Sequence, residues 1–131
     1  MAVRPFLRFT GQAEVAMHFY VSTFPDAEVL ELDLYGPDDP SREGTVKGAT
    51  FRIADLTLSC IDSPDVSSFG FTPAVSFFFD CQDEETLNTL FARPCDRGNV
   101  FMPPDRYPCA RRFAWLSDRY GASRQLSLAP E

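Results

Sequence analysis

The apolar residues along the chain change their spacing several times, and each change predicts the boundary of an element. Residues 5–9 are a short apolar run typical of a strand, and residues 12–24 place apolar side chains along one helix face. Residues 27–35 alternate between apolar and acidic positions, which predicts a half-buried strand. Residues 45–53 and 56–62 read as two strands of a hairpin with a tight turn between them.

The second half of the chain opens with its central apolar stretch, residues 71–81, which predicts a fully buried strand. A helix is expected over residues 83–94, because acidic side chains favour a helix N-terminus and a proline favours its end. The remaining pattern predicts strands over residues 99–102, 112–116 and 123–128. Both halves therefore read strand, helix, strand, strand, strand.

This repetition predicts a duplicated fold. Placing Phe6 on Phe77, an offset of 77 minus 6 or 71, puts Ala16 on Leu87, although the strands could slip by one against the helices. We expect one domain, residues 1–131, made of a βαβββ module at 1–66 and another at 71–131. The predicted class is α+β, with two curved mixed sheets that enclose a cleft and helices outside. Small ligands generally bind in clefts of this kind.

The two-residue period of a strand sorts the central stretch into two faces. Ser76 and Phe78 share one face, and Val75, Phe77 and Phe79 are expected to point toward the helix layer. Aromatic groups beside isolated polar groups suit a small, partly aromatic ligand. The residues predicted to line such a ligand site are Ser76, Phe78, Gln125, Trp115, Phe113, Tyr107 and Met102, unless the aromatic side chains simply fill the core. The proline-containing loop 103–109 is expected either to act as a lid or only to be rigid.

Composition and charge narrow the function classes. The net charge is −7 and the isoelectric point about 4.6, which opposes a nucleic-acid binder or a protein that docks on anionic lipid. No stretch reads as a signal peptide or a transmembrane segment, so we expect a soluble cytoplasmic protein. The four cysteines form no C-x-x-C pair, and we expect them to be reduced.

Few residues suit catalysis. The single histidine, His18, lies off the apolar helix stripe and one turn after Glu14, which indicates a solvated pair and leaves no base for a Ser or Cys nucleophile. Carboxylates at strand ends or in loops could act as acid or base, although each is more typical of a turn or a solvated position. They are Asp62, Asp80, Asp105 and Asp118, and Asp62 is of most interest because it ends a hairpin strand.

Three stretches carry a resemblance to a known family: residues 19–25, residues 71–76, and the motif Met102-Pro103…Tyr107…Trp115…Asp118-Arg119-Tyr120-Gly121…Gln125-Leu126. Together they resemble the PhnB-like branch, labelled 3-demethylubiquinone-9 3-methyltransferase, of the vicinal oxygen chelate superfamily, and they cover nearly the whole chain. The resemblance implies the duplicated fold and a homodimer. The chain departs from the family pattern at residues 96–99, where a Gly-Gly is usual, and at Arg124, where a Trp is usual.

Metal-dependent members of the superfamily place their ligands at positions that correspond here to Pro5-Phe6, Ser59–Asp62, Ser76 and Gln125. This set offers hydroxyl and amide groups, with Cys60 or Asp62 in addition, and no histidine, whereas transition metals favour imidazole, thiolate or carboxylate. We therefore expect no metal and no cofactor, with Ser59 and Asp62 contributing to ligand binding. Ser76, where metal-using relatives would place a histidine, is the strongest argument for this expectation.

The methyltransferase label finds little support, because the seven glycines contain no G-x-G of the kind that opens an S-adenosylmethionine site. The favoured interpretation is a PhnB-like protein that binds a small aromatic or apolar molecule in a metal-free cleft, with enzymatic activity left open. The alternatives are a metal-dependent lyase, isomerase or dioxygenase of the glyoxalase type, and a scaffold dimer without a ligand. No nucleic-acid or membrane partner is expected.

Overall fold

The computed structural model describes residues 1–63 and 70–129, which lie in two compact units, Met1–Gly70 and Phe71–Glu131. Each unit carries one helix and a four-stranded mixed sheet, so the fold is α+β and the predicted tandem of βαβββ modules is confirmed. Neither helix in the described ranges is long and apolar enough to cross a membrane. That the two modules form a single domain around a shared cleft stays a prediction.

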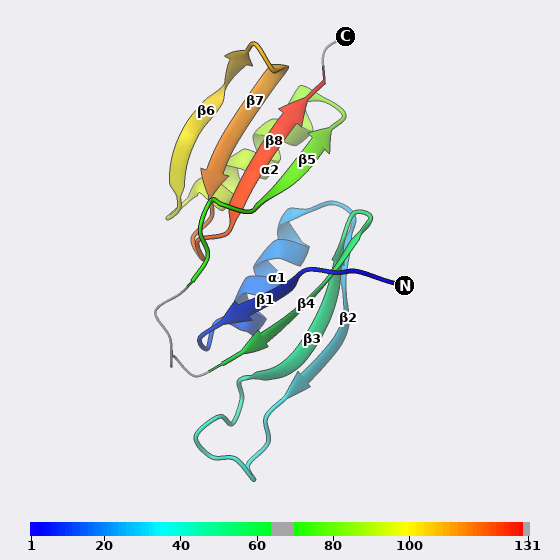
Figure 1. Ribbon diagram of the computed structural model, residues 1–131, viewed down its shortest axis with the longest axis vertical. Helices are drawn as coiled ribbons and strands as arrows, with labels where there is room; N and C mark the ends of the chain where they lie inside the picture. Colours follow the sequence, from blue (N-terminus) through cyan, green and yellow to red (C-terminus); the bar gives the residue numbers. More distant parts are fainter. Residues whose placement is uncertain (64–69, 130–131) are drawn as a thin grey trace. The chain divides into compact units, whose positions relative to one another are not determined.

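The first unit runs β1 (Phe6–Phe9), α1 (Ala13–Thr23), β2 (Ala27–Leu34), β3 (Val46–Ile53) and β4 (Leu56–Asp62), as Figure 1 shows. Its sheet has the order β1-β4-β3-β2, in which β1 pairs parallel with β4 and the other neighbours are antiparallel. The first strand of the unit therefore lies beside its last.

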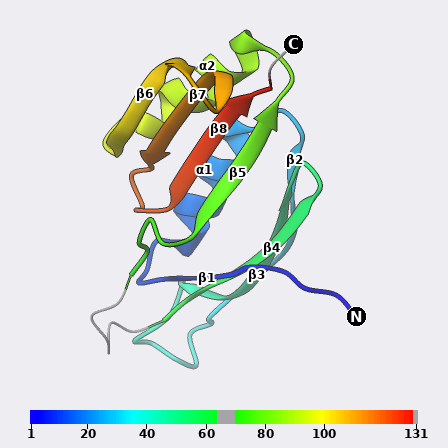
Figure 2. The same cartoon turned by 45° about the horizontal axis from the view of Figure 1, so that its top comes forward.

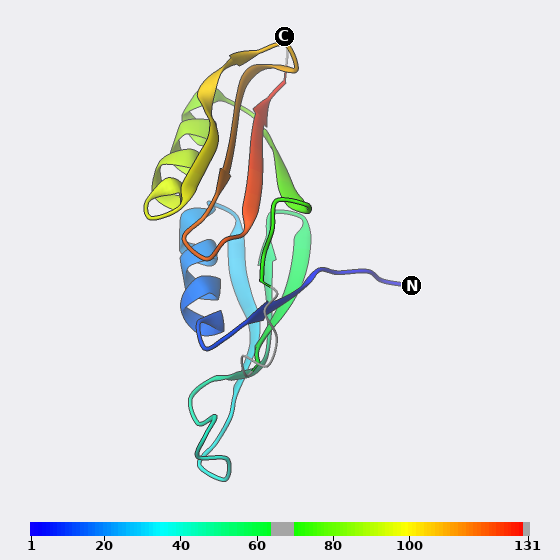
Figure 3. The same cartoon turned by 60° about the vertical axis from the view of Figure 1, so that its left-hand side comes forward.

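The second unit repeats this plan with β5 (Ser76–Cys81), α2 (Glu84–Cys95), β6 (Asn99–Tyr107), β7 (Ala110–Ser117) and β8 (Ser123–Leu128). The order is β5-β8-β7-β6, again with a parallel pair between the first and last strands (Figure 2). In each unit the helix covers one face of its own sheet (Figure 3). We call the other face the open face of that sheet.

The helices pack on their sheets through the apolar residues that the helical period predicted. Ala16 and Met17 of α1 are fully buried, and the ring of Tyr20 stacks on Phe51 of β3 with centroids 6.2 Å apart. In the second unit Leu87 of α2 and Leu126 of β8 are fully buried. His18 and Glu14 form the expected exposed pair, at 3.6 Å.

The two modules correspond with the slip between strands and helices that the sequence allowed. Ala16 and Leu87 are equivalent in burial, which keeps the helix offset of 71. In the sheets, however, Phe6 pairs with Ser59 as Ser76 pairs with Ser123, so the strands correspond at 76 minus 6, an offset of 70. Placing Phe6 on Phe77 is therefore wrong by one residue, and a shift of one moves a strand side chain to the other face.

The strand β2 is not half-buried as its alternating pattern predicted. Its leucines Leu30, Leu32 and Leu34 are 50%, 36% and 39% exposed. Two physical reasons account for this. The strand lies at the edge of the sheet, and a bulge after Val29 interrupts the register with β3, so that the alternation of faces is not continuous along the strand.

The predicted loop 103–109 is also wrong. The strand β6 continues through both prolines to Tyr107, and β7 begins at Ala110, which leaves a two-residue connection. Proline cannot donate to a sheet ladder, yet β6 is an edge strand with register shifts on either side of Met102 and Asp105, where a missing donor is tolerated. Similarly, Pro94 lies inside the last turn of α2, one residue before its end.

Candidate functional site

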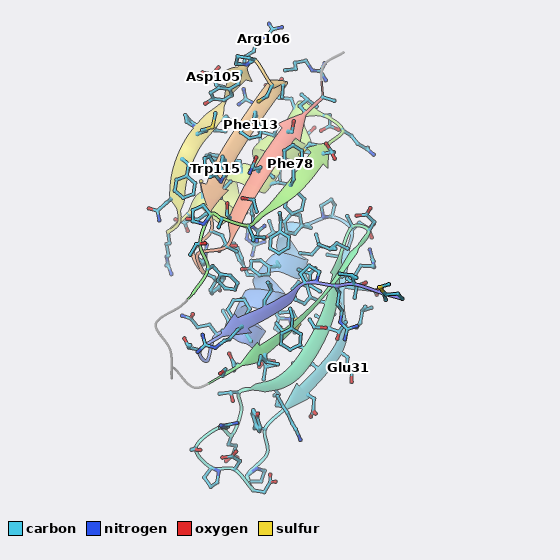
Figure 4. All side chains as sticks on the ribbon, in the orientation of Figure 1. Glu31, Phe78, Asp105, Arg106, Phe113 and Trp115 are labelled. Carbon is cyan, nitrogen blue, oxygen red and sulfur yellow. The ribbon has the colours of Figure 1, made fainter. Side chains whose placement is uncertain are left out.

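The open face of the second sheet gathers most of the residues predicted to bind a ligand. Leu126 of β8 is fully buried on the α2 side, and by the two-residue period Gln125 and Ser123 both point away from α2. Register then places Phe78, beside Gln125, and Ser76, beside Ser123, on the open face as predicted. Figure 4 shows Phe78, Phe113 and Trp115 on this side of the sheet.

Aromatic rings are in contact on this face, and we refer to Phe78, Phe101, Tyr107, Phe113 and Trp115 as the aromatic cluster. The ring of Phe113 lies 6.5 Å from Phe78 and 6.0 Å from Tyr107, in an edge-on arrangement with the latter. Phe101 and Trp115 are closer, with centroids 4.9 Å apart. Phe113 is buried, but Phe78 and Phe101 are 55% and 42% exposed. The cluster therefore presents ring surface to solvent, which a purely core-filling set would not do.

A polar triad lies beside the aromatic cluster and consists of Ser76, Ser123 and Trp115. The Oγ atoms of the two serines are 2.6 Å apart, and the indole Nε1–H of Trp115 donates to Ser123 Oγ over 2.9 Å. Ser123 is buried, whereas Ser76 is half-buried. Three strands thus meet at one hydroxyl, which fixes the orientation of the indole ring.

Gln125 occupies the centre of the same face, beside Phe78 on one strand and Trp115 on the other. Its side chain is half-buried and makes no hydrogen bond with the described residues. Met102 pairs with Trp115 across the β6–β7 ladder and is also half-buried. The structure therefore brings together seven of the nine predicted site residues, leaving out Ser59 and Asp62.

Ser59 lies on the open face of the first sheet. Its buried Oγ accepts from Arg4 Nε at 2.7 Å and lies 3.3 Å from Thr50 Oγ1. By strand register it is the counterpart of Ser123, since Ser59 pairs with the first residue of β1 and Ser123 with the first residue of β5.

Asp62 lies on the opposite side of that sheet and has a structural role. Its Oδ1 accepts backbone N–H groups of Gly11 and Ala13 at 2.8 and 3.0 Å, and its Oδ2 accepts Val46 N–H at 2.9 Å. Gln12, at the N-cap of α1, makes no side-chain cap, so the Asp62 carboxylate takes that role and complements the helix dipole. Asp62 is therefore not included in the candidate ligand site.

The other carboxylates considered for acid–base chemistry are also accounted for. The buried Asp118 accepts backbone N–H groups of Tyr120 and Ala122 and pairs with Arg124 at 2.9 Å, so it holds the β7–β8 turn. Asp105 accepts from its neighbour Arg106 N–H, and both lie exposed on β6 (Figure 4). Asp80 is exposed on β5. The aromatic cluster and the polar triad are thus built without a carboxylate.

The two buried thiols, Cys60 and Cys81, are poor nucleophiles. Burial, together with the charge of Asp62, raises the pKa of Cys60 to about 11. Burial also raises the pKa of Cys81 on β5. A thiol with a raised pKa is mostly protonated near neutral pH and reacts slowly.

Two residues of the site were missed from the sequence. Ser123 was overlooked although the two-residue period places it on the same face as Gln125. Phe101 contacts Trp115 because the ladder shifts between Val100 and Met102, and a local shift of this kind leaves no clear signal in the sequence. The first signal was available; the second was not.

The positions that hold a metal in metal-dependent relatives do not fit one in this chain. On the open faces they carry Phe6 and Ser59 in the first unit and Ser76 and Gln125 in the second. Hydroxyl and amide groups are weak ligands for divalent transition metals, and both serines already bond to neighbours. Among the described residues there is also no group of three or more His, Cys, Asp or Glu side chains placed to hold an ion.

The strand-to-helix turns likewise do not fit S-adenosylmethionine bound at a glycine-rich turn. A helix N-terminus receives a ligand through its unpaired N–H groups. At α1 the Asp62 carboxylate accepts Ala13 N–H at 3.0 Å, and at α2 the Asp83 side chain accepts Thr86 N–H at 2.7 Å. Both ends are thus occupied by a carboxylate of the chain itself.

Comparison with known proteins places the chain in a family. The family described as 3-demethylubiquinone-9 3-methyltransferase matches residues 1–127. A PhnB protein from Bacillus cereus, whose description carries the same methyltransferase name, is 41% identical, with a TM-score of 0.93 over 98% of this chain and 100% of that chain. A search of curated proteins returned no match.

More distant structures share the fold. A glyoxylase/bleomycin resistance protein/dioxygenase domain from Frankia sp. EAN1pec is 14% identical, with a TM-score of 0.68 over 99% of this chain and 98% of that chain. The fosfomycin resistance protein FosX from Listeria monocytogenes is 13% identical, with a TM-score of 0.67 over 99% of this chain and 94% of that chain. The chain therefore belongs to the PhnB-like family described as 3-demethylubiquinone-9 3-methyltransferase.

Proposed function

We propose that this protein binds a small aromatic or apolar molecule on the open face of the second sheet, without a metal ion. The observation that carries the proposal is the aromatic cluster, in which Phe78 and Phe101 keep 55% and 42% of their surface exposed beside a polar triad. Exposed ring surface next to a few fixed polar groups is typical of a site for an aromatic ligand.

The proposal is one of binding, and no reaction step is assigned. Asp62 and Asp118 are held by backbone N–H groups, and the exposed Asp80 is the carboxylate that shares the open face with Phe78. A methyl transfer named by the family label would need a methyl donor, and neither strand-to-helix turn fits one.

Trp115, the only tryptophan, makes the proposal directly testable. Its indole N–H gives a single tryptophan signal in a ¹H–¹⁵N NMR spectrum, and it lies against Phe101 in the aromatic cluster. Titration with 1-ethylnaphthalene, a purely apolar aromatic probe, is expected to move this signal saturably. An indole signal that stays in place up to the solubility limit of the probe would overturn the proposal.

A pair of truncations gives the matched control. Phe78→Ala removes a ring that is 55% exposed, and it is expected to weaken binding about three- to tenfold, the range for an aromatic contact. Val15→Ala on α1 removes a side chain that is similarly exposed but lies outside the site, and it is expected to leave the affinity unchanged. Equal effects of both substitutions would place the ligand elsewhere.

We also propose a homodimer. The edge strand β2 carries three leucines that are between 36% and 50% exposed, and an exposed apolar edge favours association. Light scattering at micromolar concentration is expected to give twice the chain mass. A single-chain mass at that concentration would rule the dimer out, and Leu32→Lys is expected to produce that mass if β2 lies in the interface.

The proposed compartment is the cytoplasm. All four cysteines are free, which suits a reducing environment. Cell fractionation with a periplasmic marker tests this proposal, and recovery of the protein with that marker would contradict it.

A further inference from the structure

The hydrogen atoms of the polar triad can be counted. Trp115 supplies one indole N–H, and Ser76 and Ser123 supply one hydroxyl hydrogen each, which makes three donors. Two hydrogen bonds join the triad: Trp115 Nε1 to Ser123 Oγ, and one between the two Oγ atoms. Neither serine side chain makes another hydrogen bond with the described residues. One hydroxyl hydrogen therefore remains without an acceptor among the described residues.

The burial of the two serines decides which hydroxyl carries that hydrogen. Either oxygen could donate across the 2.6 Å contact. If Ser76 were the donor, the remaining hydrogen would belong to Ser123, which is only 2% exposed, and a buried donor without an acceptor is destabilising. If Ser123 is the donor, the remaining hydrogen belongs to the half-buried Ser76, which faces the open side of the sheet. The second arrangement is favoured.

From this we infer that the ligand carries a hydrogen-bond acceptor, such as a carbonyl oxygen, that binds the hydroxyl of Ser76. The inference rests on the proposed function and adds the polar group that the ligand must have. The hydrogen bonds run from Trp115 to Ser123, from Ser123 to Ser76, and from Ser76 to the ligand. An aromatic ketone combines the ring for the aromatic cluster with the acceptor for Ser76.

The direction of the hydrogen bonds also assigns a role to each residue of the polar triad. The indole donor takes one lone pair of Ser123 and thereby favours Ser123 as donor to Ser76. Ser76 then has its own hydrogen free for a ligand. Trp115 and Ser123 are positioning residues in this scheme, and Ser76 is the residue that contacts the ligand.

Two probes of equal size test the inference. 1-Acetonaphthone carries a carbonyl group, and 1-ethylnaphthalene carries a methylene in place of that group. Titrations of the full-length protein, followed by the Trp115 indole signal, are expected to show 1-acetonaphthone bound about two- to tenfold more tightly, the range for one neutral hydrogen bond. In Ser76→Ala this preference is expected to disappear, while the affinity for 1-ethylnaphthalene stays the same.

Ser127→Ala is the matched control, because Ser127 lies on β8 with Ser123 and on the same face but outside the triad, and it is expected to keep the preference. In Ser123→Ala the indole proton is expected to move upfield as its acceptor is lost. Equal affinities for the two probes in the wild-type protein, or a preference that survives Ser76→Ala, would overturn the inference alone. Binding of neither probe would overturn the proposed function and, with it, the inference.

Discussion

The carboxylate of Asp62, the last residue of β4, accepts a hydrogen bond from the backbone N–H of Ala13, the first residue of α1, over 3.0 Å. The two residues are 49 positions apart in the chain. A helix whose own N-cap position provides no side-chain acceptor is thus capped from the far end of its module. The same carboxylate also binds β3 through Val46 N–H.

Asp62→Ala is expected to destabilise the first unit by about 2–4 kcal/mol, because the N–H groups of Ala13 and Val46, in buried hydrogen bonds, and that of Gly11, in a part-buried one, lose their acceptor together. Urea unfolding measures the change. Asp33→Ala, on an exposed position of β2, serves as the control and is expected to change the free energy of unfolding by less than about 0.5 kcal/mol. A similar small effect of Asp62→Ala would mean that water replaces the carboxylate.

Arg97→Gly is expected to stabilise the protein. Arg97 has a φ of 65°, in the left-handed region that disfavours side chains. Relief of this strain, less the backbone entropy of glycine, leaves about 1 kcal/mol, which thermal unfolding would register as a rise of a few degrees. A fall in the melting temperature would show that the Arg97 side chain stabilises the protein by more than its left-handed backbone conformation destabilises it.

Gly98→Ala, at the next residue, is expected to destabilise the protein. A Cβ at this position would overlap the backbone carbonyl oxygen of Ser117, which belongs to the strand beside β6 and cannot move as a side chain could. We expect a loss of about 2 kcal/mol or more, with strand β6 displaced. Hydrogen exchange of the β6–β7 ladder is the decisive measurement, since protection equal to that of the wild-type protein would refute the clash.

The Asp83 cap gives α2 a pH dependence. Hydrogen bonds from Thr86 lower the pKa of this carboxyl below its ordinary value. Its contribution is therefore fully present above the unfolded pKa of about 3.9 and is lost as the pH falls through the lower folded pKa. Asp83→Asn is expected to flatten the stability curve below pH 4, measured by thermal unfolding at a series of pH values. Parallel curves for both proteins would exclude the cap as the source.

The cysteines are expected to react in order of exposure. Cys109 is exposed in the β6–β7 connection, whereas the pKa of Cys60 is about 11, so at pH 8 only about one Cys60 thiol in a thousand is ionised. A disulfide reagent such as DTNB should show a rapid phase that Cys109→Ser abolishes. Cys60 is expected to react only on unfolding, and rapid labelling of Cys60 in the folded protein would contradict its burial.

The repeat and the faces of the central strand could be predicted from the sequence, because both follow from period alone. Ser76 and Phe78 share the open face, as the two-residue period required. What period cannot show is whether a neighbouring element covers a face. The leucines of β2 alternate as a half-buried strand should, yet they lie on an edge strand and stay exposed.

The site was predicted less completely for a related reason. Asp62 was placed correctly at the end of β4, but only the parallel pairing of β1 with β4 decides that its carboxylate faces the start of α1. Likewise, the prolines of β6 indicated a loop because local preference cannot tell an edge strand from a central one. Long-range pairing, which one sequence does not display, separates these outcomes.

The parallel pairing of first and last strands has a consequence for the order of events during synthesis. In each unit the first strand leaves the ribosome early but has no partner until the last strand follows, at residue 56 in the first unit and 123 in the second. The helix α1 must also wait for Asp62 before it is capped. The nascent chain therefore carries an apolar strand exposed for most of a module's length, and each unit closes only when its final residues emerge.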